Sequence, residues 1–296
     1  MVSHEDPRTI EGIRRLLVRY QTRANHRLGQ HFLIEPDVYE TMARLADAAG
    51  CVGSLEIGPG PGGLTLSLLE HDHAVIAIEL DKTLADLVRH ETECFGKQIR
   101  VFCQDAVETS WQKLVQEAGF PEPVCLVGNL PYYVTGPLVA KLWEDPIRWT
   151  RAIFMLQKEV AERLAAAPGD RSAGAQSVLI RYVGIPSIAR IVPKDAFYPP
   201  PEVDSAVLVV DRVPSPPVEL AELRWWVRAG FQHRRKMLRQ ALSLAPESIW
   251  DKKGWERHLA AAGIEASRRA ESLRMEEWLQ LAATRPTRKQ HCKKID

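Results

Sequence analysis

The chain has 296 residues, of which 45% are hydrophobic, and its 39 Lys+Arg nearly balance its 38 Asp+Glu, for a formal net charge of +1. This length suits one large domain or a large and a small one, and the composition excludes collagen, a coiled coil and wholesale disorder. No apolar run approaches the ~20 residues of a membrane-spanning helix and no secretory signal is visible, so we expect no membrane partner.

The five cysteines are odd in number, far apart and without a C-x-x-C pair. This pattern encodes neither a zinc site nor a disulfide framework, and it indicates a reducing compartment. We therefore predict a cytoplasmic protein without a bound metal, and we expect it to act as a monomer.

The first half of the chain alternates apolar runs with segments of helical spacing. The predicted strands are Ser54–Ile57, Ala74–Ile78, Ile99–Phe102, Val124–Val127 and Ala152–Leu156, and the clearest helical stretches are Leu64–Leu69 and Lys82–His90. Strands that alternate with helices predict a parallel sheet covered on both faces. Two later runs, Val178–Val183 and Ser205–Val210, are predicted to complete the sheet. The class is α/β, with one domain over residues 28–211.

The composition changes around residues 211–218, where Asp-Arg-Val-Pro-Ser-Pro-Pro-Val indicates a stiff linker. The chain that follows has helical spacing over Glu219–Leu244, Trp255–Ala262 and Met275–Ala283. We predict a small all-helical domain over residues 219–284. The basic residues 285–296 are predicted to be a disordered tail, and residues 1–27 a basic helical segment.

A glycine-rich segment lies between the first predicted strand and the helix after it. Gly58, Gly60 and Gly63 have the spacing G-x-G-x-x-G, which lets the backbone turn tightly and approach a ligand beside a helix N-terminus. Glu79 ends the next strand, where its carboxylate can accept hydrogen bonds from both ribose hydroxyls of a nucleotide. A plain strand-to-helix turn could also contain these glycines, but Glu79 at this position favours a nucleotide-type ligand.

Two later strand ends help to select the ligand. Asp105 follows the third strand and could accept from an adenine amine, although a carboxylate that caps a helix is an equally good interpretation of its spacing. The fourth strand ends in Asn129-Leu130-Pro131-Tyr132, a much more specific signal.

The tetrapeptide at residues 129–132 suits methyl transfer to a conjugated amine. The nitrogen lone pair of an adenine N6 amine is delocalised into the ring, so the amine is a poor nucleophile. The Asn129 side-chain oxygen and the Leu130 carbonyl can accept its two N–H groups and direct the lone pair at the methyl of S-adenosylmethionine. Pro131 stiffens the turn, and Tyr132 offers a face on which an extruded base can stack.

On these motifs the chain resembles the KsgA (RsmA/Dim) family of ribosomal RNA adenine N6,N6-dimethyltransferases over nearly its whole length. Eight segments carry the resemblance, in this order: Leu28-Gly-Gln-His-Phe-Leu33, Glu56-Ile-Gly-Pro-Gly60, Ile78-Glu-Leu-Asp81, Gln104-Asp-Ala106, Asn129-Leu-Pro-Tyr132, Met155-Leu-Gln-Lys-Glu159, Phe197-Tyr-Pro-Pro-Pro-Glu-Val-Asp-Ser205 and Phe231-Gln-His-Arg-Arg-Lys236. The resemblance implies a Rossmann-like fold that uses S-adenosylmethionine, with a small C-terminal helical domain.

The resemblance also implies roles for individual residues. The implied cofactor contacts are His31, Leu33, Gly58, Gly60, Glu79, Asp105 and Asn129. The implied acceptor site contains Asn129, Leu130, Pro131 and Tyr132, with Phe197 stacked on the target adenine opposite Tyr132. The residues alone would make Phe197 a loop-anchoring core residue and His31 a structural histidine.

The charge distribution points to RNA at both ends of the chain. Residues 1–27 carry a net charge of +3, residues 28–210 of −9 and residues 211–296 of +7. The predicted helix over residues 219–244 contains Arg234, Arg235, Lys236 and Arg239, which could contact phosphates together with Arg268, Arg269 and Arg274. A second set, Arg14, Arg15, Arg19, Arg23 and Arg27, lies in the N-terminal segment. The alternative for each set is a solvated helix face.

The sequence therefore predicts an enzyme that dimethylates two adjacent adenosines near the 3′ end of small-subunit rRNA, within a ribosomal assembly intermediate. One alternative is an Erm-like enzyme of large-subunit rRNA. Another is a ribosome-assembly factor that retains the fold without activity, and a third is a NAD-dependent dehydrogenase.

Overall fold

The structure is a computed structural model that describes residues 5–25 and 28–284. These residues form two compact units. The first contains the described residues up to Glu162 together with Ile185–Arg212, and the second contains Arg163–Gly184 and the described residues from Val213 onwards. Arg27 and the predicted tail at 285–296 lie outside the described residues.

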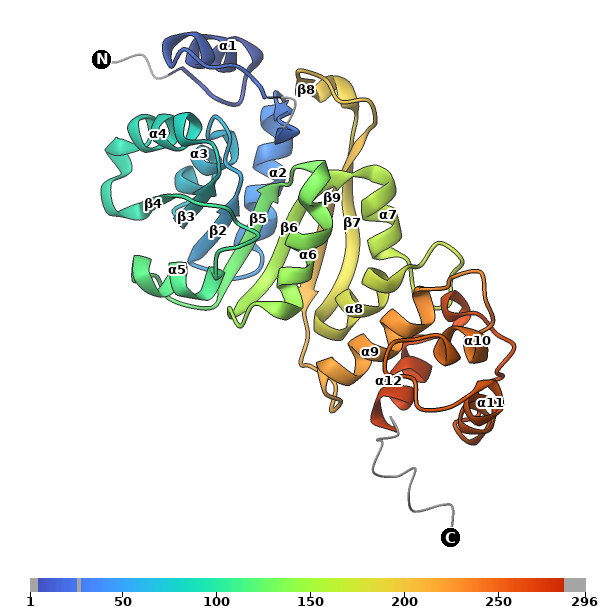
Figure 1. The fold of residues 1–296 in the computed structure, drawn as a ribbon. Coiled ribbons are helices and arrows are strands. Elements are labelled where there is room, and N and C mark those ends of the chain that lie inside the picture. Colours follow the sequence, from blue (N-terminus) through green and yellow to red (C-terminus); the bar gives the residue numbers. More distant parts are fainter. Residues whose placement is uncertain (1–4, 26–27, 285–296) are drawn as a thin grey trace. The chain divides into compact units, whose positions relative to one another are not determined.

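The first unit is built on a seven-stranded sheet, whose strands can be followed in Figure 1 from β4 to β7. Their spatial order is β4 (Ile99–Cys103), β3 (Ala74–Glu79), β2 (Gly53–Ile57), β5 (Val124–Asn129), β6 (Trp149–Gln157), β9 (Ser205–Arg212) and β7 (Gly184–Val192). The strands from β4 to β6 are parallel. All five residues of β2 are buried, so both faces of the sheet are covered.

The prediction of a wholly parallel sheet is wrong at β9. β9 runs antiparallel to β6, and Gln157 at the end of β6 is paired with Ser205 at the start of β9. β9 therefore begins beside the C-terminal end of β6 and runs in the opposite direction. The predicted strands at 54–57, 74–78, 99–102, 124–127, 152–156 and 205–210 are confirmed.

The helices of the first unit connect these strands. They are α1 (Ile10–Arg19), α2 (Pro36–Asp47), α3 (Gly63–Glu70), α4 (Lys82–Glu91), α5 (Trp111–Ala118) and α6 (Thr135–Glu144), and α7 (Lys158–Ala165) begins in this unit. Asp81 caps α4 by accepting from the backbone N–H groups of Thr83 and Leu84, which places the end of β3 directly before a helix. A short antiparallel pair, β1 (Phe32–Leu33) and β8 (Phe197–Tyr198), joins two distant segments of the chain.

The second unit is helical and differs from the predicted domain in its bounds. It contains α8 (Ala175–Val183), α9 (Leu220–Phe231), α10 (Leu238–Ser243), α11 (Lys252–Ala261) and α12 (Met275–Ala283). The predicted strand at 178–183 is wrong, because this apolar run forms most of α8. A short apolar run fits a buried strand or a buried helix equally well, and here the packing of α8 against α9 decides.

The predicted long helix over 219–244 is also interrupted. Residues 232–237 between α9 and α10 are not helical. Leu238 N–H donates to the Arg268 carbonyl over 2.7 Å, and Arg239 N–H donates to the Ala266 carbonyl over 3.3 Å. These long-range bonds tie the start of α10 to a distant segment, which a continuous helix would not allow. No helix in the described part of the chain is long and apolar enough to span a membrane.

Candidate functional site

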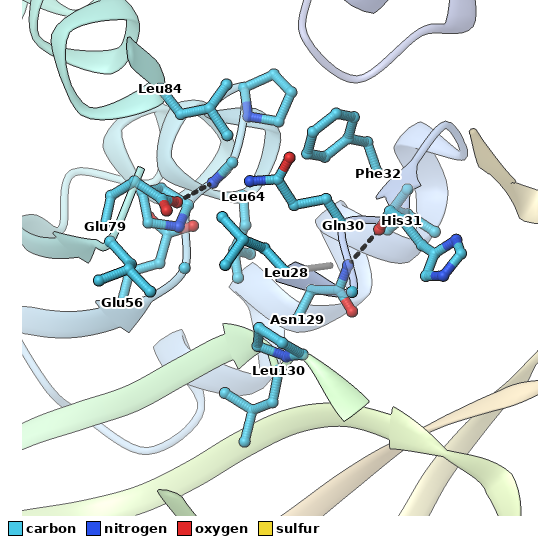
Figure 2. A pocket seen from close by; sticks show the side chains of 18 of the residues that line it. Leu28, Gln30, His31, Phe32, Glu56, Leu64, Glu79, Leu84, Asn129 and Leu130 are labelled. Carbon is cyan, nitrogen blue, oxygen red and sulfur yellow. Dashed lines mark hydrogen bonds between the residues drawn. The ribbon is translucent and has the colours of Figure 1, made fainter. Parts of the chain in front are cut away.

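A cavity lies in the first unit where β2, β3 and β5 end, at the edge where parallel sheets usually bind their ligands (Figure 2). It is lined by nine of the residues that the sequence singled out: His31, Leu33, Gly58, Gly60, Glu79, Asn129, Leu130, Pro131 and Tyr132. The tertiary structure thus brings together a glycine turn, a strand-end carboxylate and the acceptor tetrapeptide, which come from distant segments of the chain.

The glycine turn and Glu79 form one hydrogen-bonded unit. Gly60 has a φ of +56°, a conformation that favours glycine, and its N–H donates to Glu79 Oε2 over 3.1 Å. The Asp81 N–H donates to the other carboxylate oxygen over 2.9 Å. Glu79 is 6% exposed, and burial raises its pKa, whereas these two backbone donors oppose the rise. The carboxylate is therefore held in one orientation at the cavity.

A second buried carboxyl group, Glu56, also lines the cavity. It lies near the end of β2 and is 1% exposed. Glu56 belongs to the segment Glu56-Ile-Gly-Pro-Gly60, but its sequence context predicted no role for it. The sequence did contain a signal for such a role, because Glu56 is a charged residue inside an otherwise apolar strand. Charged side chains are rarely fully buried unless they are paired.

The loop at residues 129–132 is anchored by Asn129. Its Nδ2 donates to the backbone carbonyl of His31 over 3.0 Å, as Figure 2 shows. This bond fixes the plane of the amide, so Oδ1, the hydrogen-bond acceptor, is directed away from His31. The backbone N–H of Leu130 donates to the Met155 carbonyl over 3.0 Å, which ties the loop to β6.

Tyr132 is held from two sides. Its hydroxyl and that of Ser205 share a hydrogen bond of 2.8 Å, and its ring stacks on His31 with the ring centroids 5.9 Å apart. The Nδ1 of His31 donates to the carbonyl of Pro199 over 2.8 Å. The His31 ring therefore positions Tyr132, a role that the spacing of the residues did not indicate.

Two predicted site residues do not line the cavity. Asp105 is exposed, and its Oδ1 accepts from the Val107 N–H over 2.8 Å, so it forms a local turn of the kind that the sequence left open. Phe197 is 2% exposed and lies in the hydrophobic core, where it pairs with Leu33 in the β1–β8 ladder. In this structure Phe197 anchors the loop, and stacking on a base would require its side chain to become exposed.

In the second unit the predicted RNA-binding cations differ in their secondary structure and in whether they are paired with carboxylates. Only Arg239 lies in a helix, and its guanidinium pairs with Glu256 over 2.7 Å. Arg234, Arg235 and Lys236 lie in the turn between α9 and α10, so the prediction that all four share a helix is wrong.

Arg234 has a structural role within the second unit. Its Nε donates to Glu271 over 2.7 Å and its Nη2 to the carbonyl of Arg171 over 2.7 Å. By contrast, the side chains of Arg235 and Lys236 are exposed, and they have no ion pair or hydrogen bond with the part of the chain that the structure describes. Arg268 is also engaged, because its guanidinium pairs with Glu277 over 2.5 Å.

Three of the N-terminal arginines, Arg14, Arg15 and Arg19, contact other side chains. Arg14 lies over the ring of Tyr198, 5.0 Å from its centroid, and Arg15 pairs with Glu11 over 2.9 Å. Arg19 pairs with both Glu5 and Glu91. Arg23 lies beyond the end of α1, so the predicted helical segment is shorter than expected.

The fold and the chemistry of the cavity define a Rossmann-like methyltransferase that uses S-adenosylmethionine. The family model of the ribosomal RNA adenine dimethylases matches residues 21–283. The chain belongs to this family.

Curated relatives are similar over almost the whole chain. A protein of Anaeromyxobacter dehalogenans (strain 2CP-C), named ribosomal RNA small subunit methyltransferase A, is 40% identical over 90% of this chain and 95% of its own length. A protein of the same name from Oceanobacillus iheyensis is 35% identical over 91% of this chain and 92% of its own.

Solved structures are similar in fold. A dimethyladenosine transferase from Plasmodium falciparum has a TM-score of 0.70 at 24% identity, covering 84% of this chain and 95% of that protein. The 23S rRNA methyltransferase ErmE has a TM-score of 0.64 at 24% identity, covering 85% of this chain and 98% of ErmE.

Proposed function

We propose that this protein transfers methyl groups from S-adenosylmethionine to the N6 amines of two adjacent adenosines near the 3′ end of small-subunit rRNA, two to each amine. One observation carries the proposal: the Asn129 amide, oriented by the His31 carbonyl, lies in the same cavity as the glycine turn and Glu79. On this proposal the acceptor and donor sites are adjacent, as direct transfer requires.

The cavity suits the charge of the donor. Among its described lining residues, none is a lysine or an arginine, whereas Glu56 and Glu79 contribute two buried carboxyl groups. S-adenosylmethionine, when bound, supplies an electrophilic methyl on a positively charged sulfur. Glu79 would accept from the ribose hydroxyls, and the glycine turn would allow close approach of the cofactor to the backbone.

The acceptor loop would then activate the amine. Asn129 Oδ1 and the Leu130 carbonyl would accept its two N–H groups, so that the lone pair is no longer shared with the ring and points at the methyl group. Tyr132 would support the extruded base on its ring face. No charged general base is needed, because the amine loses its proton to solvent after transfer.

The second unit would hold the RNA through exposed cations. Arg235 and Lys236 are available for phosphates, whereas Arg234, Arg239 and Arg268 are already paired with carboxylates. Recognition of shape and phosphate suits a folded RNA of which only the target bases are extruded. We further propose that the substrate is a small-subunit assembly intermediate, that the protein is a monomer and that it acts in the cytoplasm.

The test is mass spectrometry of rRNA nucleosides after incubation of the enzyme with S-adenosylmethionine and undermethylated small subunits. We expect N6,N6-dimethyladenosine at two adjacent positions near the 3′ end. Undermethylated large subunits serve as the parallel substrate. Methylation of the large-subunit RNA instead would favour an Erm-like activity, and methylation of neither would favour an assembly factor without activity.

A further inference from the structure

Glu56 lines the cavity and is almost completely buried. In the sheet it lies between Ala77 of β3 and Val127 of β5, both fully buried. Thr65 Oγ1 donates to Glu56 Oε2 over 2.6 Å. Thr65 stabilises the carboxylate through both its hydroxyl and its backbone, but burial outweighs these two contributions, so the ionised form of Glu56 is disfavoured.

The groups around Glu56 add little positive charge. Burial and the nearby carboxylate of Glu79 raise the pKa of Glu56 to about 8, with Thr65 opposing the rise. The hydroxyl of Tyr39 on α2 lies close enough for its own pKa to be raised by burial and by Glu56. His31 is the basic side chain among the described residues that line the cavity. Burial and the neighbouring carboxylate therefore both favour the protonated form of Glu56 in the free protein.

A cation bound in this cavity would shift Glu56 from its protonated form toward its ionised form. The low dielectric of a buried site strengthens the attraction between a carboxylate and a nearby positive charge. S-adenosylmethionine carries a positive sulfur, whereas the sulfur of S-adenosylhomocysteine is neutral. The two ligands otherwise differ by a single methyl group, so they form a matched pair for testing the effect of charge.

We propose that Glu56 discriminates the methyl donor from its product by charge: it releases its proton when S-adenosylmethionine binds and keeps it when S-adenosylhomocysteine binds. The O–H bond of the carboxyl breaks, the proton passes to the solvent, and the carboxylate balances the sulfonium. This inference rests on the proposed function, because it assumes that the cavity binds the methyl donor.

Proton linkage then favours exchange of product for donor. The affinity for S-adenosylmethionine rises with pH up to about pH 8, the pKa of Glu56 in the free protein, and then levels off. The affinity for S-adenosylhomocysteine lacks this contribution. After methyl transfer the positive charge leaves with the methyl group, the carboxyl takes up a proton again, and the product is held less tightly than the donor.

The test is isothermal titration calorimetry of the full-length protein at pH 7 in buffers that differ in ionisation enthalpy. The number of protons released is measured for S-adenosylmethionine and for S-adenosylhomocysteine. We expect more protons to be released by the donor than by the product, with a difference of up to about one. Glu56→Gln should abolish the difference and reduce the preference for the donor by about tenfold, which corresponds to one pKa unit.

The exposed Glu93, which lies outside the cavity, provides the matched control. Glu93→Gln should leave both the proton release and the preference unchanged. If Glu56→Gln does not fold, Thr65→Val tests the same idea. Loss of the hydroxyl donor raises the pKa of Glu56, so the pH at which donor affinity levels off should move upward.

Equal proton release for the two ligands in the unsubstituted protein would overturn the inference, as would a difference that persists in Glu56→Gln. Both results would leave the proposed function intact, since both ligands would still bind. Failure of S-adenosylmethionine to bind at all would instead count against the proposed function itself.

Discussion

The side-chain amide of Asn129 is fixed by the backbone carbonyl of His31, which accepts from Nδ2 over 3.0 Å. The two residues are 98 positions apart in the chain. Because the amide nitrogen donates to the His31 carbonyl, the amide oxygen is the atom that can accept a hydrogen bond from an amine. The orientation of this amide oxygen is therefore set before any substrate binds, as the role proposed for Asn129 requires.

Asn129→Ala should reduce turnover by roughly 10²–10³, the usual effect of removing one preorganised polar group. Turnover on undermethylated small subunits is the measurement. The circular dichroism spectrum and the melting temperature of the same variant provide the control for folding. A variant that retained near-normal turnover would show that Asn129 does not hold the amine.

Tyr132→Phe should reduce turnover only about fivefold, because it keeps the ring and loses one hydrogen bond, worth about 1 kcal/mol, to Ser205. Ser205→Ala removes the same bond from the other side and should match it. Tyr132→Ala also removes the stacking face and should cost roughly a further tenfold to a hundredfold. Equal effects of Tyr132→Phe and Tyr132→Ala would argue against stacking of the base on Tyr132.

Substitution of Arg235 and Lys236 together by Ala should weaken RNA binding and reduce its salt dependence, by about one unit of slope for each phosphate that the side chains had neutralised. The dissociation constant for small subunits is measured between about 50 and 200 mM salt.

Arg234→Ala is the matched comparison for the double variant, since Arg234 is bonded to Glu271 and to the Arg171 carbonyl. It should lower the thermal stability of the second unit and change the salt slope less. If Arg234→Ala reduced the slope as much as the double variant, Arg234 would also contact phosphate.

The pH dependence of stability should reveal the ion pairs of His71 in the first unit. Hydrogen bonds with Glu40 and Asp47 raise its pKa above the usual value of about 6.5. The stabilisation is fully present below about pH 6.5 and is lost as the pH rises through the raised pKa of the folded state. The difference in unfolding free energy between the unsubstituted protein and His71→Gln should therefore shrink between about pH 6 and pH 9. A difference that is constant with pH would mean that protonation of His71 does not contribute.

The sequence alone determined the strands of the sheet centre and the chemistry of the cavity. A continuous apolar run such as Val124–Val127 indicates a buried strand, and two such strands end in a polar residue, Glu79 and Asn129. Asn129 and Glu79 could be assigned because their positions after such strands already imply a ligand at that edge. The motifs likewise sufficed for the family and the cofactor.

The tertiary structure alone decided which residues meet. The spacing of apolar residues at 178–183 fits a helix and a strand equally well. The segment is a helix because it packs against α9. Local spacing also could not tell that Arg234 is paired with Glu271 while Arg235 next to it is free of such bonds within the described chain. The bond from Asn129 to His31 and the burial of Glu56 depend on segments that are distant in the chain. Periodicity reports burial along one segment, whereas hydrogen-bond partners and pKa shifts depend on what the rest of the chain places beside it.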